Sequence, residues 1–62
     1  MFHNEMELKE ACSKLLKEKG IRLKYLSLLL DLSKEGVDFW DGEKIYENFK
    51  KWLELSVKNN LI

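Results

Sequence analysis

The segment RLKYLSLLLDLSKE, residues 22–35, carries the pattern that decides the fold. At about 100° of rotation per helical residue, its polar side chains gather on one arc of roughly 100°, and nearly all the others are apolar. The apolar side chains make two neighbouring ridges, which consist of Leu23, Leu26 and Leu30 and of Tyr25, Leu28, Leu29 and Leu32. A helix that merely lies on a core needs an apolar stripe of about 100°. The segment therefore predicts a central helix that is covered from two sides.

Two further helical patterns flank this segment, and Gly20 and Gly36 separate them from it. Residues 5–19 and 42–58 each carry an apolar stripe at helical spacing, and glycine after such a pattern is typical of a helix end with positive φ. The sequence predicts an all-α fold, a small three-helix bundle with the leucine-rich second helix at its centre. The helices are expected at about 5–19, 22–35 and 42–58, within a single helical domain that spans residues 1–62.

The starts of the two flanking helices have recognisable capping residues. Asn4 precedes the first helical pattern and Asp41 the third, and both residue types are preferred N-caps. Trp40 stands just before Asp41, where a hydrophobic residue often packs on the first turn of the helix. The predicted core stripe of the third helix consists of Ile45, Tyr46, Phe49, Trp52, Leu53, Ser56 and Val57.

The length and charge of the chain restrict its function. A 62-residue domain buries only about 60% of the surface of its unfolded chain, so it gains from oligomerisation or from burial against a partner. Eleven basic and eleven acidic residues give a net charge of zero, and they alternate along the chain. We therefore expect no surface patch of one sign, which disfavours binding to nucleic acid.

The sequence also indicates a compartment. It contains no apolar run of the 18 or so residues that span a bilayer and no secretory signal, so no membrane association is expected. A single free thiol, Cys12, fits a reducing environment. We expect an intracellular protein, cytoplasmic or nuclear, either complete or a part of a larger one.

No enzyme site can be assembled from these residues. Cys12 falls on the core face of the first helix, and His3, the one histidine, precedes that helix. Asp38, Asp41 and Glu43 suggest a calcium loop, but the segment is too short and aromatic residues separate the acids. We predict no catalytic, metal or cofactor site, no cofactor and no small-molecule substrate.

The helices carry partial matches to two binding motifs. Leu26, Leu29 and Leu30 have the spacing of short helices that dock into apolar grooves, although the same spacing is typical of any core helix. A helix-turn-helix needs a turn of three or four residues, and the link at 36–42 is longer and aromatic.

The chain has more large apolar side chains than so small an interior can bury. We therefore predict a non-enzymatic protein interaction or assembly module that forms a homo-oligomer or docks on a protein partner. The expected interface residues are Tyr25, Leu28, Phe39, Trp40 and Leu55, with the alternative that Phe39 and Trp40 cover the open end of the bundle. The competing function is a small helical regulator that associates with nucleic acid, such as a viral or plasmid-type repressor.

Overall fold

The structure, a computed structural model, describes residues 2–37 and 41–61. Within these residues the helices are α1 (Glu5–Glu18), α2 (Leu26–Lys34) and α3 (Gly42–Lys58), and the 3-10 turn η1 (Leu23–Tyr25) leads into α2. The predicted all-α three-helix bundle is confirmed, and α2 packs against both α1 and α3. The bounds of α3 are those predicted, whereas α1 ends one residue early and the second helical segment is part 3-10 and part α.

Both predicted N-caps are confirmed. The backbone N–H of Glu7 donates to Oδ1 of Asn4 at 2.9 Å, and the backbone N–H of Lys44 donates to Oδ1 of Asp41 at 3.1 Å. Each bond satisfies one of the N–H groups that the first turn of a helix leaves without an internal partner.

The end of α1 explains why the chain turns where it does. Gly20 has φ +72°, as predicted, and the N–H of Ile21 donates to the Leu16 carbonyl at 2.9 Å. This Schellman arrangement ends α1 and directs the chain into η1. Asn60, with φ +55°, ends α3 in the same way, since the N–H of Leu61 reaches the Ser56 carbonyl at 2.8 Å.

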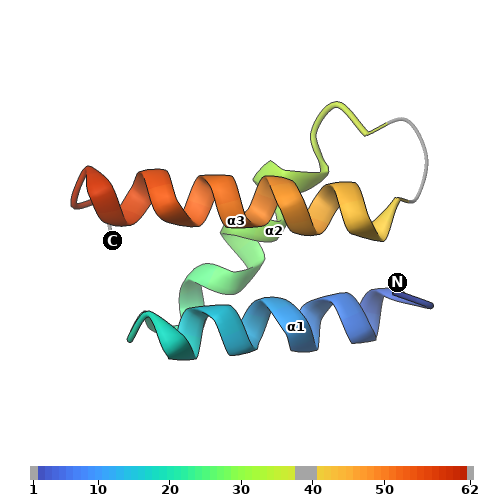
Figure 1. The fold of residues 1–62 in the computed structure, drawn as a ribbon, viewed down its shortest axis with the longest axis horizontal. Coiled ribbons are helices and arrows are strands. Elements are labelled where there is room, and N and C mark those ends of the chain that lie inside the picture. The colour runs from blue at the N-terminus through green and yellow to red at the C-terminus, as the bar shows by residue number, and fades with distance from the viewer. Residues whose placement is uncertain (1, 38–40, 62) are drawn as a thin grey trace.

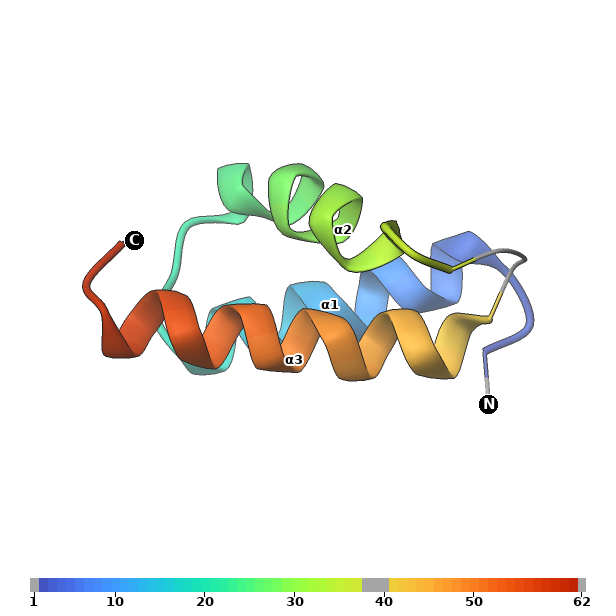
Figure 2. The same ribbon diagram turned by 90° about the horizontal axis from the view of Figure 1, so that it is seen from above.

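The three helices are not all antiparallel. In Figures 1 and 2, α1 and α3 begin at the same end of the molecule and run side by side in one direction. The shorter α2 runs back along one side of this pair, beginning beside the end of α1 and finishing beside the first half of α3. As a result, the link after α2 can return the chain to the end at which α1 began.

The core lies between the three helices and takes residues from each. The buried apolar residues are Leu8, Cys12 and Leu16 of α1, Leu29 and Leu30 of α2, and Ile45, Phe49 and Leu53 of α3. Ser33 is also completely buried, and its hydroxyl donates to the Leu29 carbonyl at 2.6 Å. Phe2 folds against this core, and its ring centroid lies 5.2 Å from that of Tyr46.

Three apolar residues that were predicted to be in the core are exposed instead. Trp52 and Val57 are 40% and 42% exposed because they lie at opposite edges of the α3 stripe, whose centre is the line through Phe49 and Ser56. Leu23 is 47% exposed. It belongs to η1, the short 3-10 turn before α2, none of whose residues is fully buried.

Candidate protein interaction surface

The apolar surface of α2 is wider than its two neighbours cover. Lys34 forms an ion pair with Glu5, which identifies the side of α2 that faces α1. Leu28 precedes Lys34 by six residues and therefore lies about 120° around the helix from it. Its side chain is 56% exposed. The second ridge of the central helix is thus only partly covered.

The neighbouring side of α3 also carries exposed apolar groups. Nδ2 of Asn48 donates to the Ser33 carbonyl at 3.0 Å, which identifies the side of α3 that faces α2. Trp52 and Leu55 follow Asn48 by four and seven residues, so they share its side of the helix. Trp52 is 40% and Leu55 is 50% exposed.

These residues define what we call the α2–α3 apolar surface. Its exposed members are Leu28, Trp52 and Leu55. Leu32 and Tyr25 are half-buried and lie four residues after and three residues before Leu28, on the same side of the second helical segment. Nζ of Lys24 lies over the Tyr25 ring, 5.2 Å from its centroid, so a cation borders the apolar groups at one end.

The structure brings together three of the five residues predicted for the interface. Tyr25, Leu28 and Leu55 lie on the α2–α3 apolar surface. Phe39 and Trp40 lie outside the described residues. The structure therefore does not test the predicted packing of Trp40 on the first turn of α3, nor the alternative that Phe39 and Trp40 cover the open end of the bundle. Trp52 joins the surface although its sequence spacing indicated the core. The sequence held one signal of this exposure: Trp52 lies at the edge of its apolar stripe, four residues after the polar Asn48.

The charges of the bundle separate into two halves, contrary to the expectation of no patch of one sign. One half contains the second part of α1, the turn after it, η1 and the end of α3, and the other contains the first parts of α1 and α3 and the end of α2. We call them the basic half and the acidic half. The basic half has six cationic side chains (Lys14, Lys17, Lys19, Arg22, Lys24 and Lys58) and one acidic side chain, Glu18, a net charge of +5. The acidic half has, among its described residues, seven acidic side chains (Glu5, Glu7, Glu10, Asp31, Glu35, Asp41 and Glu43) and three lysines (Lys9, Lys34 and Lys44), a net charge of −4.

The parallel course of α1 and α3 causes this separation. Acidic side chains are stabilised near the first turn of a helix and basic ones near the last turn. Glu5 and Glu43 begin α1 and α3, and Lys17 and Lys58 end them. Because the two helices start at the same end of the bundle, their charged turns coincide. Each helix dipole contributes only about half an elementary charge of opposite sign, so the side-chain charge prevails.

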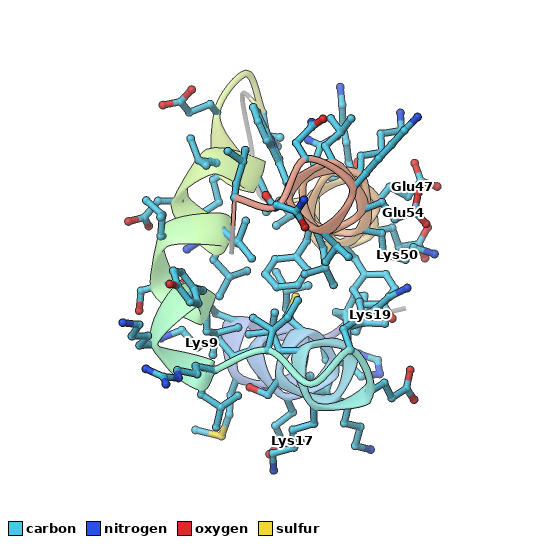
Figure 3. All side chains as sticks on the ribbon, turned by 90° about the vertical axis from the view of Figure 1, so that its left-hand side faces the viewer. Lys9, Lys17, Lys19, Glu47, Lys50 and Glu54 are labelled. Carbon is cyan, nitrogen blue, oxygen red and sulfur yellow. The ribbon has the colours of Figure 1, made fainter. Side chains whose placement is uncertain are left out.

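The middle of α3 separates the two halves and is electrically neutral. Its charged residues are Glu47, Lys50, Lys51 and Glu54. In Figure 3 the labelled Glu47, Lys50 and Glu54 project from the side of α3 that faces away from α2. They are therefore remote from the α2–α3 apolar surface.

A shallow hollow lies in the basic half. It has a volume of about 300 Å³ and is lined by Lys19, Gly20, Ile21, Arg22, Tyr25 and Val57. Its charged groups are both cationic, and Tyr25 joins it to the α2–α3 apolar surface. An anionic group is therefore the ligand that this hollow favours.

The potentially reactive groups have structural roles. Cys12 is fully buried, and this burial raises the pKa of its thiol to about 12, so the nucleophilic thiolate is scarce at neutral pH. His3 is exposed, and its backbone N–H donates to Oε2 of Glu7 at 2.7 Å. Burial also raises the pKa of Tyr46. In the described parts of the chain, no three His, Cys, Asp or Glu side chains gather in a way that would hold a metal ion.

Comparisons with known proteins give no further constraint. No family model, curated protein or solved structure matches the chain. Over residues 2–37 and 41–61, no helix combines the length and apolarity that crossing a membrane requires. The surface features described above are therefore the basis for a functional proposal.

Proposed function

We propose that the protein is a non-enzymatic interaction or assembly module, which dimerises or docks on a protein partner through the α2–α3 apolar surface. The observation that carries this proposal is the exposure of Leu28, Trp52 and Leu55 on adjoining sides of two packed helices. Contiguous exposed apolar groups on a small protein are typical of interaction sites, and tryptophan and tyrosine are enriched where interfaces concentrate their binding energy.

The size of the surface indicates a moderate affinity. Complete burial of one such side chain contributes about 1.5–3 kcal/mol, and these three are already about half buried. Association costs about 4–15 kcal/mol in lost freedom of motion, so a tight complex needs further contacts from the half-buried Tyr25 and Leu32. We therefore expect association in the micromolar range.

The experiment measures molecular mass by sedimentation velocity and light scattering over a range of concentrations around the micromolar. The wild-type chain is expected to associate, and Leu28→Glu or Leu55→Glu to prevent association while circular dichroism and the Tm stay nearly unchanged. Met6→Glu is the matched control, because Met6 is 70% exposed on α1 and lies outside the surface.

Two outcomes would contradict dimerisation through this surface. One is a wild-type chain that stays monomeric at every concentration. The other is that Leu28→Glu and Leu55→Glu associate as strongly as the control Met6→Glu. The contact would then lie elsewhere on the molecule.

The basic half supports a second candidate function, the nucleic-acid-associated regulator. The six cations of this half, of which Lys19 and Arg22 line the hollow, give local positive charge in spite of the zero net charge. Fluorescence anisotropy with a DNA duplex and with RNA at low salt tests it. Binding that weakens with salt and is lost in a Lys19→Glu, Arg22→Glu variant favours this candidate, and no binding at low salt eliminates it.

A further inference from the structure

We infer that the partner at the α2–α3 apolar surface is a second copy of this chain, whose α2 packs antiparallel to the first. The inference rests on the proposed function and adds to it the identity and orientation of the partner. Charge complementarity along α2 and between the halves of the bundle carries it.

The outer side of the second helical segment carries a charged stripe with an apolar middle. Lys24, Leu28, Asp31 and Glu35 are separated by four, three and four residues, the spacing of side chains on one side of a helix. All four are exposed. The stripe begins with a cation in the basic half and ends with two carboxylates in the acidic half.

This stripe is complementary to itself in one orientation alone. If two copies of α2 lie antiparallel about a point between Leu29 and Leu30, Lys24 of each copy lies beside Glu35 of the other. A two-fold axis repeats this ion pair, and the assembly closes as a dimer. In the parallel orientation Lys24 lies beside Lys24 and Glu35 beside Glu35, and like charges in contact destabilise.

The apolar groups and the two halves of the bundle fit the same arrangement. In this register Leu28 of one copy lies level with Asp31 of the other and one residue along from Leu32, so Leu28 packs beside Leu32 while Asp31 lies at the outer edge of the contact. The basic half of each copy also faces the acidic half of the other. Charges near the interface contribute most of the electrostatic attraction between the two copies, since the screening length is about 8 Å at physiological salt. We therefore expect dimerisation to weaken as salt is added.

Charge reversal at the two ends of the stripe tests the orientation. In the antiparallel dimer, Lys24→Glu alone places two pairs of carboxylates together, and Glu35→Lys alone places two pairs of cations together. Each single variant is expected to dimerise roughly tenfold more weakly than the wild type. A 1:1 mixture of the two variants, and the double variant K24E/E35K, restore the lost attraction and the wild-type affinity. Lys50→Glu is the control, because it makes the same charge change on the side of α3 away from α2.

Sedimentation equilibrium at low and at physiological salt gives the dissociation constants, and circular dichroism confirms that these exposed substitutions leave the helices intact. Single variants that dimerise like the wild type, with a mixture that associates more tightly, would establish the parallel orientation and overturn the inference. A dimer on which neither reversal nor mixture has an effect overturns the orientation alone. A wild-type chain that stays monomeric would overturn the inference itself, and docking on a different protein would remain as the other form of the proposed function.

Discussion

Nδ2 of Asn48 on α3 lies 3.0 Å from the backbone carbonyl oxygen of Ser33 on α2 and donates a hydrogen bond to it. This carbonyl belongs to the last turn of α2, where the helix supplies no N–H group, and the nearby N–H of Val37 donates to Lys34 instead. A side chain of one helix thus completes the hydrogen bonding of another. The bond also fixes which residues of α3 lie beside α2.

Asn48→Ala removes this bond and leaves the Ser33 carbonyl without its donor. We expect a loss of about 1 kcal/mol in the free energy of unfolding, because a partly buried acceptor loses a bond that water replaces incompletely. Urea denaturation followed by circular dichroism measures the change. Glu47→Ala, an exposed neighbour, serves as the control, and an equal effect in both variants would contradict this role for Asn48.

Ser33 occupies a site too small for a larger side chain. It is fully buried, and its hydroxyl bonds within its own helix to the Leu29 carbonyl. Ser33→Leu is expected to cost about 1–3 kcal/mol in the free energy of unfolding through overpacking. Ser33→Ala should cost less than about 1 kcal/mol, since the Leu29 carbonyl keeps its helical donor. A stabilising Ser33→Leu would disprove the tight packing at this position.

Acid should weaken the contact between α1 and α2. The hydrogen bond from Lys34 and its positive charge hold the pKa of Glu5 below its ordinary value of 4.5. The unfolded chain therefore takes up this proton more readily than the folded chain. The contribution of the pair to stability is complete above pH 4.5 and is lost as the pH falls through the lower folded pKa.

The difference in Tm between wild type and Glu5→Gln measures this contribution. We expect it to shrink as the pH falls below 4.5 and the pair is lost. Glu10→Gln, which removes another exposed carboxylate from the same helix, is the control. A difference that stays constant with pH would show that the pair does not couple to folding.

Cys12 should resist thiol reagents in the folded protein. Burial raises the pKa of its thiol from 9.0 to about 12, which lowers the thiolate population near pH 8 by roughly a thousandfold. Reaction with a disulfide reagent is expected to be slow in buffer and fast in guanidinium chloride. The same shift predicts that stability is retained below pH 9 and declines from there toward pH 12, where the unfolded thiol ionises first. A fast reaction in buffer would contradict the buried position.

Local signals in the sequence predict much of this fold. The caps at Asn4 and Asp41 and the turn at Gly20 depend on a few adjacent residues, and all three appear where expected. The spacing of apolar residues by three and four positions, which gives each helix one apolar stripe, is also a local signal. For this reason the number of helices and most of their bounds follow from spacing alone.

Spacing alone could not predict which residues at the edges of the apolar stripes are buried. Trp52 and Leu53 are adjacent in the sequence, yet Leu53 is buried and Trp52 is 40% exposed. Which edge is covered depends on the angle at which α2 crosses α3, a property of packing rather than of spacing. The candidate surface was therefore partly predicted, through Tyr25, Leu28 and Leu55, and partly missed, since Trp52 was expected in the core.

The separation of charge was not predicted from the sequence pattern. Charges that alternate along the chain separate in space once α1 and α3 point the same way, which depends on the path of the whole chain. Lys17 and Lys58 are far apart in the sequence, but they belong to the last turns of α1 and α3, and these two helices finish at the same end of the bundle. For this reason the expectation of no patch of one sign does not hold for the two halves of the bundle.

The shared direction of α1 and α3 has a consequence for how the molecule responds to an electric field. Opposite charges at the two ends of a body 31 Å long make it a permanent electric dipole, although its net charge is zero. Such a molecule turns in a field without migrating. On ion-exchange columns at pH 7 and low salt, it should be retained by both cationic and anionic resins, each of which holds it by a different end.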